Sequence, residues 1–179
     1  MTITALSDDE LSRRQRFSHR ARLRAPVDVC WSVFTDHERL GEFTDTPCRI
    51  VTPGDDEPGG LGCLRRIGTL GFEVDEVVNY WRPGELFGYH VIDSPILSHH
   101  QGFVRFWPLP DGGCEWLYDM QMVPLAAALD AQPDLIALFR TGFANYMASA
   151  ECECERRAAS YPVPPVPIPV SIHGGETGR

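Results

Sequence analysis

A long amphipathic segment near the end of the chain follows an unbroken series of strand-like segments, and this order limits the folds that the chain can adopt. Residues 133–159 carry apolar side chains at spacings of three and four, which predicts one helix with a single buried face. Pro133 suits the first helical turn, and Arg156 and Arg157 suit the negative end of the helix dipole. We therefore expect a sheet wrapped around one helix. The expected inward positions are Leu135, Leu138, Phe139, Gly142, Phe143, Tyr146 and Ala150.

Seven segments before this helix have the pattern of β-strands. In residues 17–25 apolar and polar side chains alternate, which is the period of a half-buried strand. Pro26 ends that strand, and residues 27–34 and 36–43 predict two short helices. Turns rich in glycine and proline separate the other segments, and such short connections favour antiparallel neighbours. The other predicted strands are residues 48–52, 61–67, 72–81, 86–92, 99–107 and 114–123.

The chain length and composition predict one domain with two extensions. With 179 residues and 43% hydrophobic content, the chain is large enough for a single core over residues 16–159. Residues 1–15 are polar and predict a flexible arm that is either disordered or loosely helical. Residues 160–179 carry proline at about every second position near their start, which predicts an extended tail. This tail is either disordered or a contact for a protein partner.

Charge and cysteine content exclude several classes of function. The net charge of −9 argues against nucleic-acid binding, and the arginines of residues 1–24 predict a solvated strand face rather than a basic binding arm. Six scattered cysteines without a CxxC pair or a Cys/His cluster predict a reduced, cytoplasmic protein with no metal site and no cofactor. No apolar run approaches the length of a membrane span, so we expect no integral membrane association.

Several local patterns carry a family resemblance. They are APVDVCWSVFTD at residues 25–36, EVVNYWRPGE at 76–85, GFVRFWP at 102–108 and a Gly-Gly pair before the last strand. In this order they resemble the START-like and polyketide cyclase (SRPBCC) superfamily over residues 17–157. The resemblance implies the α+β helix-grip fold, a seven-stranded curved antiparallel sheet wrapped around a long C-terminal helix, with two short helices between strands 1 and 2. It also implies a deep cavity between sheet and helix, entered near the helix pair and the strand turns.

Strand parity and the resemblance together predict which residues line this cavity. For residues 72–81 the two criteria conflict: alternation favours the apolar set Phe72, Val74, Val78 and Tyr80, whereas superposition on the cyclases places Val77, Asn79 and Trp81 inside. We favour the second set. The predicted ligand-binding residues are Leu40, Phe43, Val77, Asn79, Trp81, Phe87, Tyr89, Val91, His100, Val104, Phe106, Trp116, Tyr118, Met120, Leu135, Leu138, Phe139, Gly142, Asn145 and Tyr146.

His100 and Tyr118 are the candidate catalytic residues. Adjacent strand residues face opposite sides, so at most one of His99 and His100 enters the cavity, and we expect His100 to do so as a general acid or base. The alternative is an ordinary hydrogen-bonded histidine beside tyrosines that fill the core. By the same parity one of Arg65 and Arg66 points inward and anchors a carboxylate, or both lie at the sheet edge.

Two further positions come from the resemblance. It places Asn145 where aromatic polyketide cyclases carry a pocket asparagine, and Trp81 where they carry an arginine that orients the substrate. Because the arginine is replaced, we favour a binding or transfer protein for a hydrophobic small molecule such as a lipid, an isoprenoid or a polyketide-like compound. The alternatives are a polyketide cyclase, aromatase or dehydratase acting in the same cavity, and a protein-interaction module that uses the tail or the basic arm.

Overall fold

The computed structural model describes residues 6–69 and 73–160, which form one antiparallel sheet and a set of helices. The seven strands are β1 (Gln15–Leu23), β2 (Cys48–Thr52), β3 (Leu64–Ile67), β4 (Val74–Arg82), β5 (Leu86–Asp93), β6 (Leu97–Pro108) and β7 (Cys114–Pro124). The helices are α1 (Asp8–Arg13), α2 (Val27–Thr35), the short 3-10 helix η1 (His37–Arg39), α3 (Leu40–Phe43), α4 (Ala126–Ala131) and α5 (Leu135–Ala159). The predicted seven strands and late helix are confirmed.

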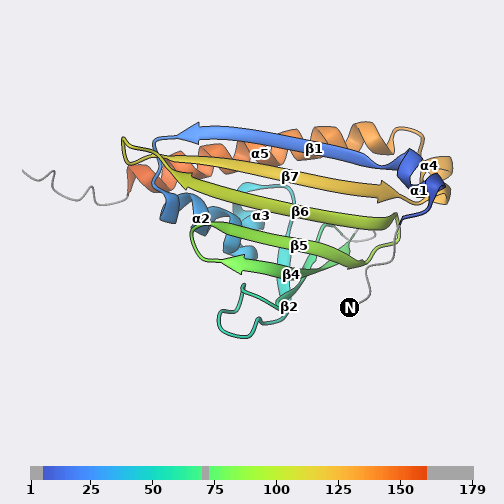
Figure 1. Cartoon of the computed structure of the whole chain (residues 1–179), viewed down its shortest axis with the longest axis horizontal. Helices are drawn as coiled ribbons and strands as arrows, with labels where there is room; N and C mark the ends of the chain where they lie inside the picture. The colour runs from blue at the N-terminus through green and yellow to red at the C-terminus, as the bar shows by residue number, and fades with distance from the viewer. Residues whose placement is uncertain (1–5, 70–72, 161–179) are drawn as a thin grey trace, which may run out of the picture.

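The strand order is β1-β7-β6-β5-β4-β3-β2, and every neighbouring pair is antiparallel. Strand β1 lies at one edge of the sheet beside β7, and β2 lies at the opposite edge. Helices α2, η1 and α3 connect these two edge strands. Helix α5 runs along the concave face of the sheet and packs against β1, α2 and α3 (Figure 1). The expected arrangement of one curved sheet around one long helix is therefore present.

An aromatic cluster fills the space between the sheet and α2. Phe34 of α2 lies at its centre, with ring centroids 5.0 Å from Trp116 and 5.7 Å from Phe106. Such edge-to-face contacts add to the stabilisation from apolar burial. This end of the concave face is solid core, so an open space between sheet and α5 has to lie towards the other end of the sheet.

A β-bulge in β4 decides which of its side chains face the concave side. Val78 lies opposite Tyr89 and Tyr80 lies opposite Gly88, so Asn79 is an extra residue in the ladder. Before the bulge Glu76 and Val78 are buried, whereas after it Tyr80 is 49% exposed and Trp81 packs inward. Neither predicted alternation holds along the whole strand, because parity reverses at the bulge.

The N-terminal segment is more ordered than predicted. Ser7 and Glu10 form a capping box at the start of α1, and Arg13 donates a hydrogen bond to the Pro124 carbonyl. The predicted arm therefore contains a helix, and α4 is a second helix that the sequence did not predict. Residues 161–179 of the predicted proline-rich tail, with its expected partner contact, lie outside the described residues.

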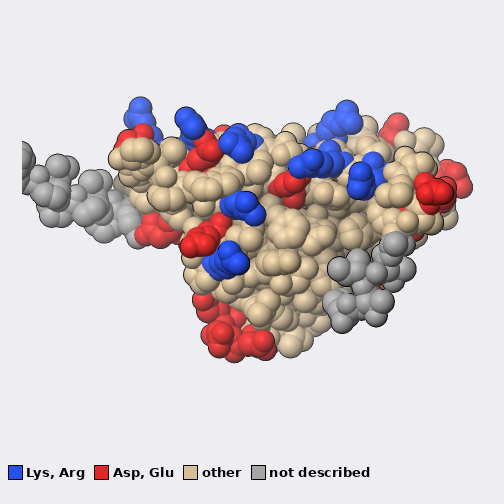
Figure 2. All heavy atoms as spheres, viewed as in Figure 1, with Lys and Arg blue, Asp and Glu red and all other residues tan. Residues whose placement is uncertain are grey.

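The arginines of β1 have acidic partners across the strand pair. Arg16 lies 2.7 Å from Asp119, and Arg20 lies 2.9 Å from Glu115, which also pairs with Arg22. Figure 2 shows basic and acidic side chains interspersed along this side of the molecule. The pairing supports the interpretation of a solvated strand face.

Candidate functional site

A cavity of about 590 Å³ lies between the concave face of the sheet and the first half of α5. Its exposed wall residues are Thr69, in the turn after β3, and Leu138 and Gly142 of α5, so the cavity opens between these segments. Leu138 is 53% exposed at this opening. The wall consists of Thr46, Arg65, Ile67, Gly68, Thr69, Val74, Glu76, Tyr89, Ile96, Leu97, His100, Tyr118, Met120, Gln132, Leu135, Leu138, Phe139, Gly142, Phe143 and Tyr146.

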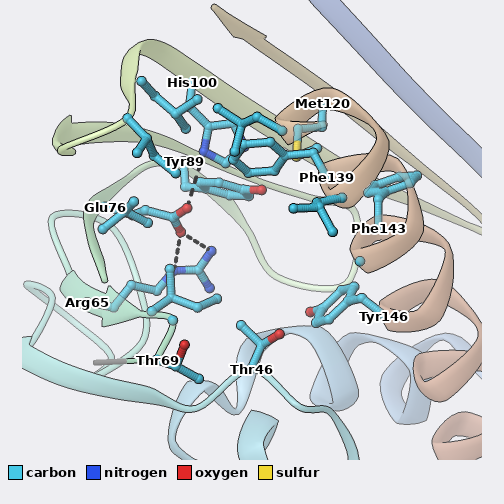
Figure 3. Close-up of a pocket in the computed structure, with 18 of the residues that line it drawn as sticks. Thr46, Arg65, Thr69, Glu76, Tyr89, His100, Met120, Phe139, Phe143 and Tyr146 are labelled. Atoms are coloured by element: carbon cyan, nitrogen blue, oxygen red, sulfur yellow. Dashed lines mark hydrogen bonds and ion pairs between the residues drawn. The ribbon is translucent and has the colours of Figure 1, made fainter. Parts of the chain in front are cut away.

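A buried ion pair forms part of the wall. Arg65 and Glu76 are directly opposite in the β3–β4 register, and the Arg65 Nε and Nη2 atoms donate to Glu76 Oε2 at 3.0 and 2.7 Å. Each side chain is only 3% exposed. Burial favours the neutral acid, but the Arg65 charge, aided by His100, holds the pKa of Glu76 below its usual value. Glu76 is therefore an ionised carboxylate at the cavity wall (Figure 3).

His37 is hydrogen-bonded to the arginine of this ion pair. The Arg65 Nη1 atom donates to His37 Nδ1 at 2.9 Å, and the His37 Nε2–H donates to the Gly59 carbonyl at 3.0 Å. Burial, and then the Arg65 charge, lower the pKa of His37 to about 3. His37 is thus a neutral imidazole with a fixed tautomer, and it joins η1 to both Arg65 and the loop before β3.

His100 stands on the other side of Glu76. Its Nδ1 lies 3.4 Å from Glu76 Oε1, which is a charge contact longer than a well-formed hydrogen bond. The imidazole is nearly buried and packs edge-on against the Tyr89 ring at 5.5 Å. As Figure 3 shows, His100 and Arg65 approach the Glu76 carboxylate from opposite sides. The result is a continuous polar cluster from His37 to His100.

Three tyrosines complete the polar part of the wall. The hydroxyls of Tyr89 and Tyr118 are hydrogen-bonded to each other, and Tyr146 reaches the cavity from α5. Burial raises the pKa of all three phenols, so they stay protonated and can donate to an oxygen atom. The Arg65 guanidinium lies 4.6 Å from the Tyr89 ring centroid, which adds a cation–π contact.

The rest of the wall is mainly apolar. Met120 extends from β7, and Phe139 and Phe143 extend from α5 (Figure 3). The Phe143 ring packs against Tyr118, with centroids 5.5 Å apart, and against Phe17 at 5.8 Å. One end of the cavity is therefore polar and buried, and the remainder suits a hydrocarbon surface.

The structure brings about half of the predicted cavity residues to the wall. Those at the wall are Tyr89, His100, Tyr118, Met120, Leu135, Leu138, Phe139, Gly142 and Tyr146. Both candidate catalytic residues, His100 and Tyr118, are among them. Their roles in binding or catalysis remain predictions, whereas their position at one cavity is observed.

Other predicted residues lie away from the cavity, in the solid core or at its border. Parity placed these side chains correctly on the concave face in most cases, but they are packed in the hydrophobic core and do not line the cavity. The buried residues of this kind are Phe87, Val104, Phe106 and Trp116. Trp81 packs against Trp31 with centroids 4.8 Å apart, and Val91 lies opposite Glu76 without reaching the wall.

Five predictions about position are wrong for identifiable reasons. Val77 alternates with the buried Glu76 and Val78 and so faces the convex side, and Asn79 is the bulge residue. Asn145 is exposed, because it lies on the solvent side of α5, so it is no pocket asparagine. Leu40 is fully packed at 1% exposure, and Phe43 lies beside Arg157 in a separate shallow groove, so neither gates the cavity.

Sequence reasoning missed Glu76 and His37 and left Arg65 open. Arg65 points towards the cavity. Arg66 points to the convex face, where its Nε lies 2.6 Å from Asp75 Oδ1. A signal was available: in an antiparallel hairpin that pairs residue 65 with 76, the order Arg-Arg and then Asp-Glu matches each arginine with a carboxylate. For His37 the sequence holds no comparable signal, because its partners are distant in the chain.

Within residues 6–69 and 73–160, no group of three or more His, Cys, Asp or Glu side chains is arranged to hold a metal ion. No helix in these ranges is both long and apolar enough to cross a membrane.

Solved structures of other proteins share this arrangement of strands and helices and identify the fold. No family model and no curated protein matches the sequence. Among solved structures, the ZhuI aromatase/cyclase from Streptomyces sp. R1128 superposes with a TM-score of 0.67 at 19% identity, over 80% of this chain and 95% of that one. The chain has the START-like helix-grip fold.

Two more structures with this START-like fold are similar. A START superfamily protein from Mycobacterium smegmatis gives a TM-score of 0.61 at 11% identity, over 81% of this chain and 97% of that one. The di-domain ARO/CYC protein BexL from the BE-7585A biosynthetic pathway gives 0.63 at 15% identity, over 84% of this chain and 52% of that one. At these identities the START-like likeness establishes the fold, and the function has to be argued from the cavity.

Proposed function

We propose that the chain binds a hydrophobic small molecule in the cavity, with an oxygen-bearing end of that molecule against the polar cluster. The observation that carries the proposal is the division of one cavity of about 590 Å³ into an apolar part and a buried polar end. This volume is within the range of sites that enclose small organic ligands. Met120, Phe139 and Phe143 supply apolar contact, and Tyr118 and Tyr146 supply hydrogen-bond donors.

A second candidate is a cyclase or dehydratase acting on a polyketide-like ligand in the same cavity. It is favoured by His100, whose Nδ1 lies next to the ionised Glu76, so that the carboxylate would stabilise an imidazolium. His100 would remove a proton from a ligand carbon that lies between two carbonyl groups. This carbon would then bond to a further carbonyl carbon of the same ligand molecule. The new alkoxide would take the proton back. Two similar structures are described as aromatase/cyclases, which supports this candidate at the level of fold.

Native mass spectrometry of gently purified protein tests the binding proposal. We expect a co-purifying hydrophobic compound of defined mass, and saturable binding of the neutral dye Nile red to ligand-free protein. Gly142→Leu adds a side chain at a wall position where the glycine faces open space, so it should weaken dye binding. Ala144→Leu is the matched control, because Ala144 is exposed on the same helix and outside the wall. Absence of both a co-purified compound and dye binding would contradict the proposal.

A further inference from the structure

Within the described wall, the arginine and carboxylate charges come from one pair, which lies beside the imidazole of His100. Arg65 and Glu76 are the only Arg, Lys, Asp or Glu residues of the described wall, and they neutralise each other. His37 behind them is a neutral imidazole. A ligand that enters therefore meets a wall whose fixed positive charge is already compensated.

The Arg65 guanidinium has little capacity left for a second carboxylate. Three of its five N–H groups are committed, two to Glu76 and one to His37. The rings of Tyr89 and Phe87 cover it, at 4.6 and 5.4 Å from its central carbon. Glu76 already holds the Nε and Nη2 edge, so a ligand carboxylate could reach only the remaining Nη1 and Nη2 N–H groups and would have to share the Arg65 charge with Glu76.

A carboxylate ligand would also bring a second negative charge close to Glu76. Two like charges in a poorly solvated site repel strongly, and the ligand would lose its hydration as well. A neutral oxygen avoids this repulsion, and its desolvation costs far less than that of a carboxylate. Two N–H groups of Arg65 have no acceptor among the described residues, and the Tyr89–Tyr118 pair has one O–H left after the bond between them.

We infer that the cavity selects uncharged ligands that carry ketone or hydroxyl oxygens, and discriminates against fatty acids and other carboxylates of equal length. The inference rests on the proposed binding function and names its ligand class. The feature that decides it is the prior engagement of Arg65 by Glu76. A cavity with an uncompensated arginine at the same place would have the opposite preference.

Competitive displacement of Nile red tests this directly. The probes are dodecan-2-one and dodecanoate, which have the same carbon number and differ in the charged group. We expect the ketone to displace the dye with an affinity at least about tenfold higher than that of dodecanoate, because the carboxylate has to be desolvated beside Glu76.

Glu76→Gln removes the negative charge of the ion pair and changes the shape of the side chain only slightly. It leaves Arg65 without its counter-charge, so the affinity for dodecanoate should rise about tenfold or more and the preference for the ketone should vanish. Asp75→Asn is the matched control, since Asp75 pairs with Arg66 on the convex face and lies outside the wall. Its ligand preference should equal that of the wild type.

The outcomes are separable. If Nile red binds and dodecanoate displaces it as well as or better than the ketone, or if neither probe displaces it, the inferred ligand class is wrong while the binding function stands. If Nile red does not bind and no compound co-purifies, the binding function fails and the inference fails with it. If circular dichroism shows that Glu76→Gln does not fold, the two probes on the wild type decide the question alone.

Discussion

Arg65 and Glu76 form an ion pair on the concave face of the sheet, with both side chains 3% exposed, whereas the adjacent pair of Arg66 and Asp75 lies on the convex face, with 36% and 16% exposed. The two pairs come from the same stretch of the β3–β4 ladder, and each joins an arginine to a carboxylate. They differ in their access to water. This contrast offers an internal comparison of a buried and a partly exposed ion pair.

Arg65→Met should lower the free energy of unfolding by about 3–5 kcal/mol, because it leaves the buried Glu76 carboxylate without its partner. Arg66→Met should cost only about 0–1 kcal/mol, since solvent screens that pair. Replacing both Arg65 and Glu76 with methionine should recover much of the loss. Urea denaturation of the three variants checks this. Equal losses for Arg65→Met and Arg66→Met would show that burial does not set the strength of the pair.

His37 should make the protein less stable in mild acid. Its pKa is lowered from 6.5 to about 3 in the folded state, so the unfolded chain binds the proton more readily. The stability is present above pH 6.5 and is lost as the pH falls from 6.5 towards 3, by at most about 1.4 kcal/mol per pH unit. His37→Asn keeps an acceptor for Arg65 and does not titrate. Urea unfolding near pH 7.5 and near pH 5.5 should therefore show a shallower pH dependence in this variant.

His100→Gln separates the two candidate functions. A cavity that only binds its ligand should keep its Nile red affinity within about threefold, since glutamine is polar and of similar size. A cyclase that uses His100 as its base should lose about 10²–10⁴-fold in turnover with a poly-β-ketone substrate. His99→Gln is the control, because the neighbouring residue of β6 points to the other face. Loss of turnover in both variants to the same extent would count against a role for His100.

Gly102 and Gly142 should respond to alanine in opposite ways. A Cβ atom on Gly102 would lie 2.5 Å from the Tyr89 hydroxyl, and that ring is held between Phe87 and Tyr118, so Gly102→Ala should destabilise by about 1–3 kcal/mol. It should also weaken dye binding by moving Tyr89. Gly142 has no neighbour within 4 Å of such an atom and lies in α5, so Gly142→Ala should stabilise by about 0.5–1 kcal/mol. Thermal unfolding of both variants measures the difference.

Strand alternation predicted some of the cavity residues correctly and others wrongly. Parity placed His100, Tyr118 and Met120 correctly, because β6 and β7 are paired without interruption over these residues. It failed along β4, where the bulge at Asn79 reverses the alternation. It also could not separate Phe87 and Val104, which are packed in the core, from Tyr89 and His100, which border the open space. That division depends on how other parts of the chain pack against the sheet.

The sequence by itself determined the seven strands, the late helix and the faces of most uninterrupted strands, because hydrophobic periodicity reports which side of a local element is buried. Only the tertiary structure decided that the Arg65–Glu76 pair is buried at the cavity wall, that His37 supports Arg65, and that Asn145 faces solvent. These relationships depend on strand register, on one bulge and on the rotation of α5. They are set by contacts between different elements of the fold, which no local period encodes.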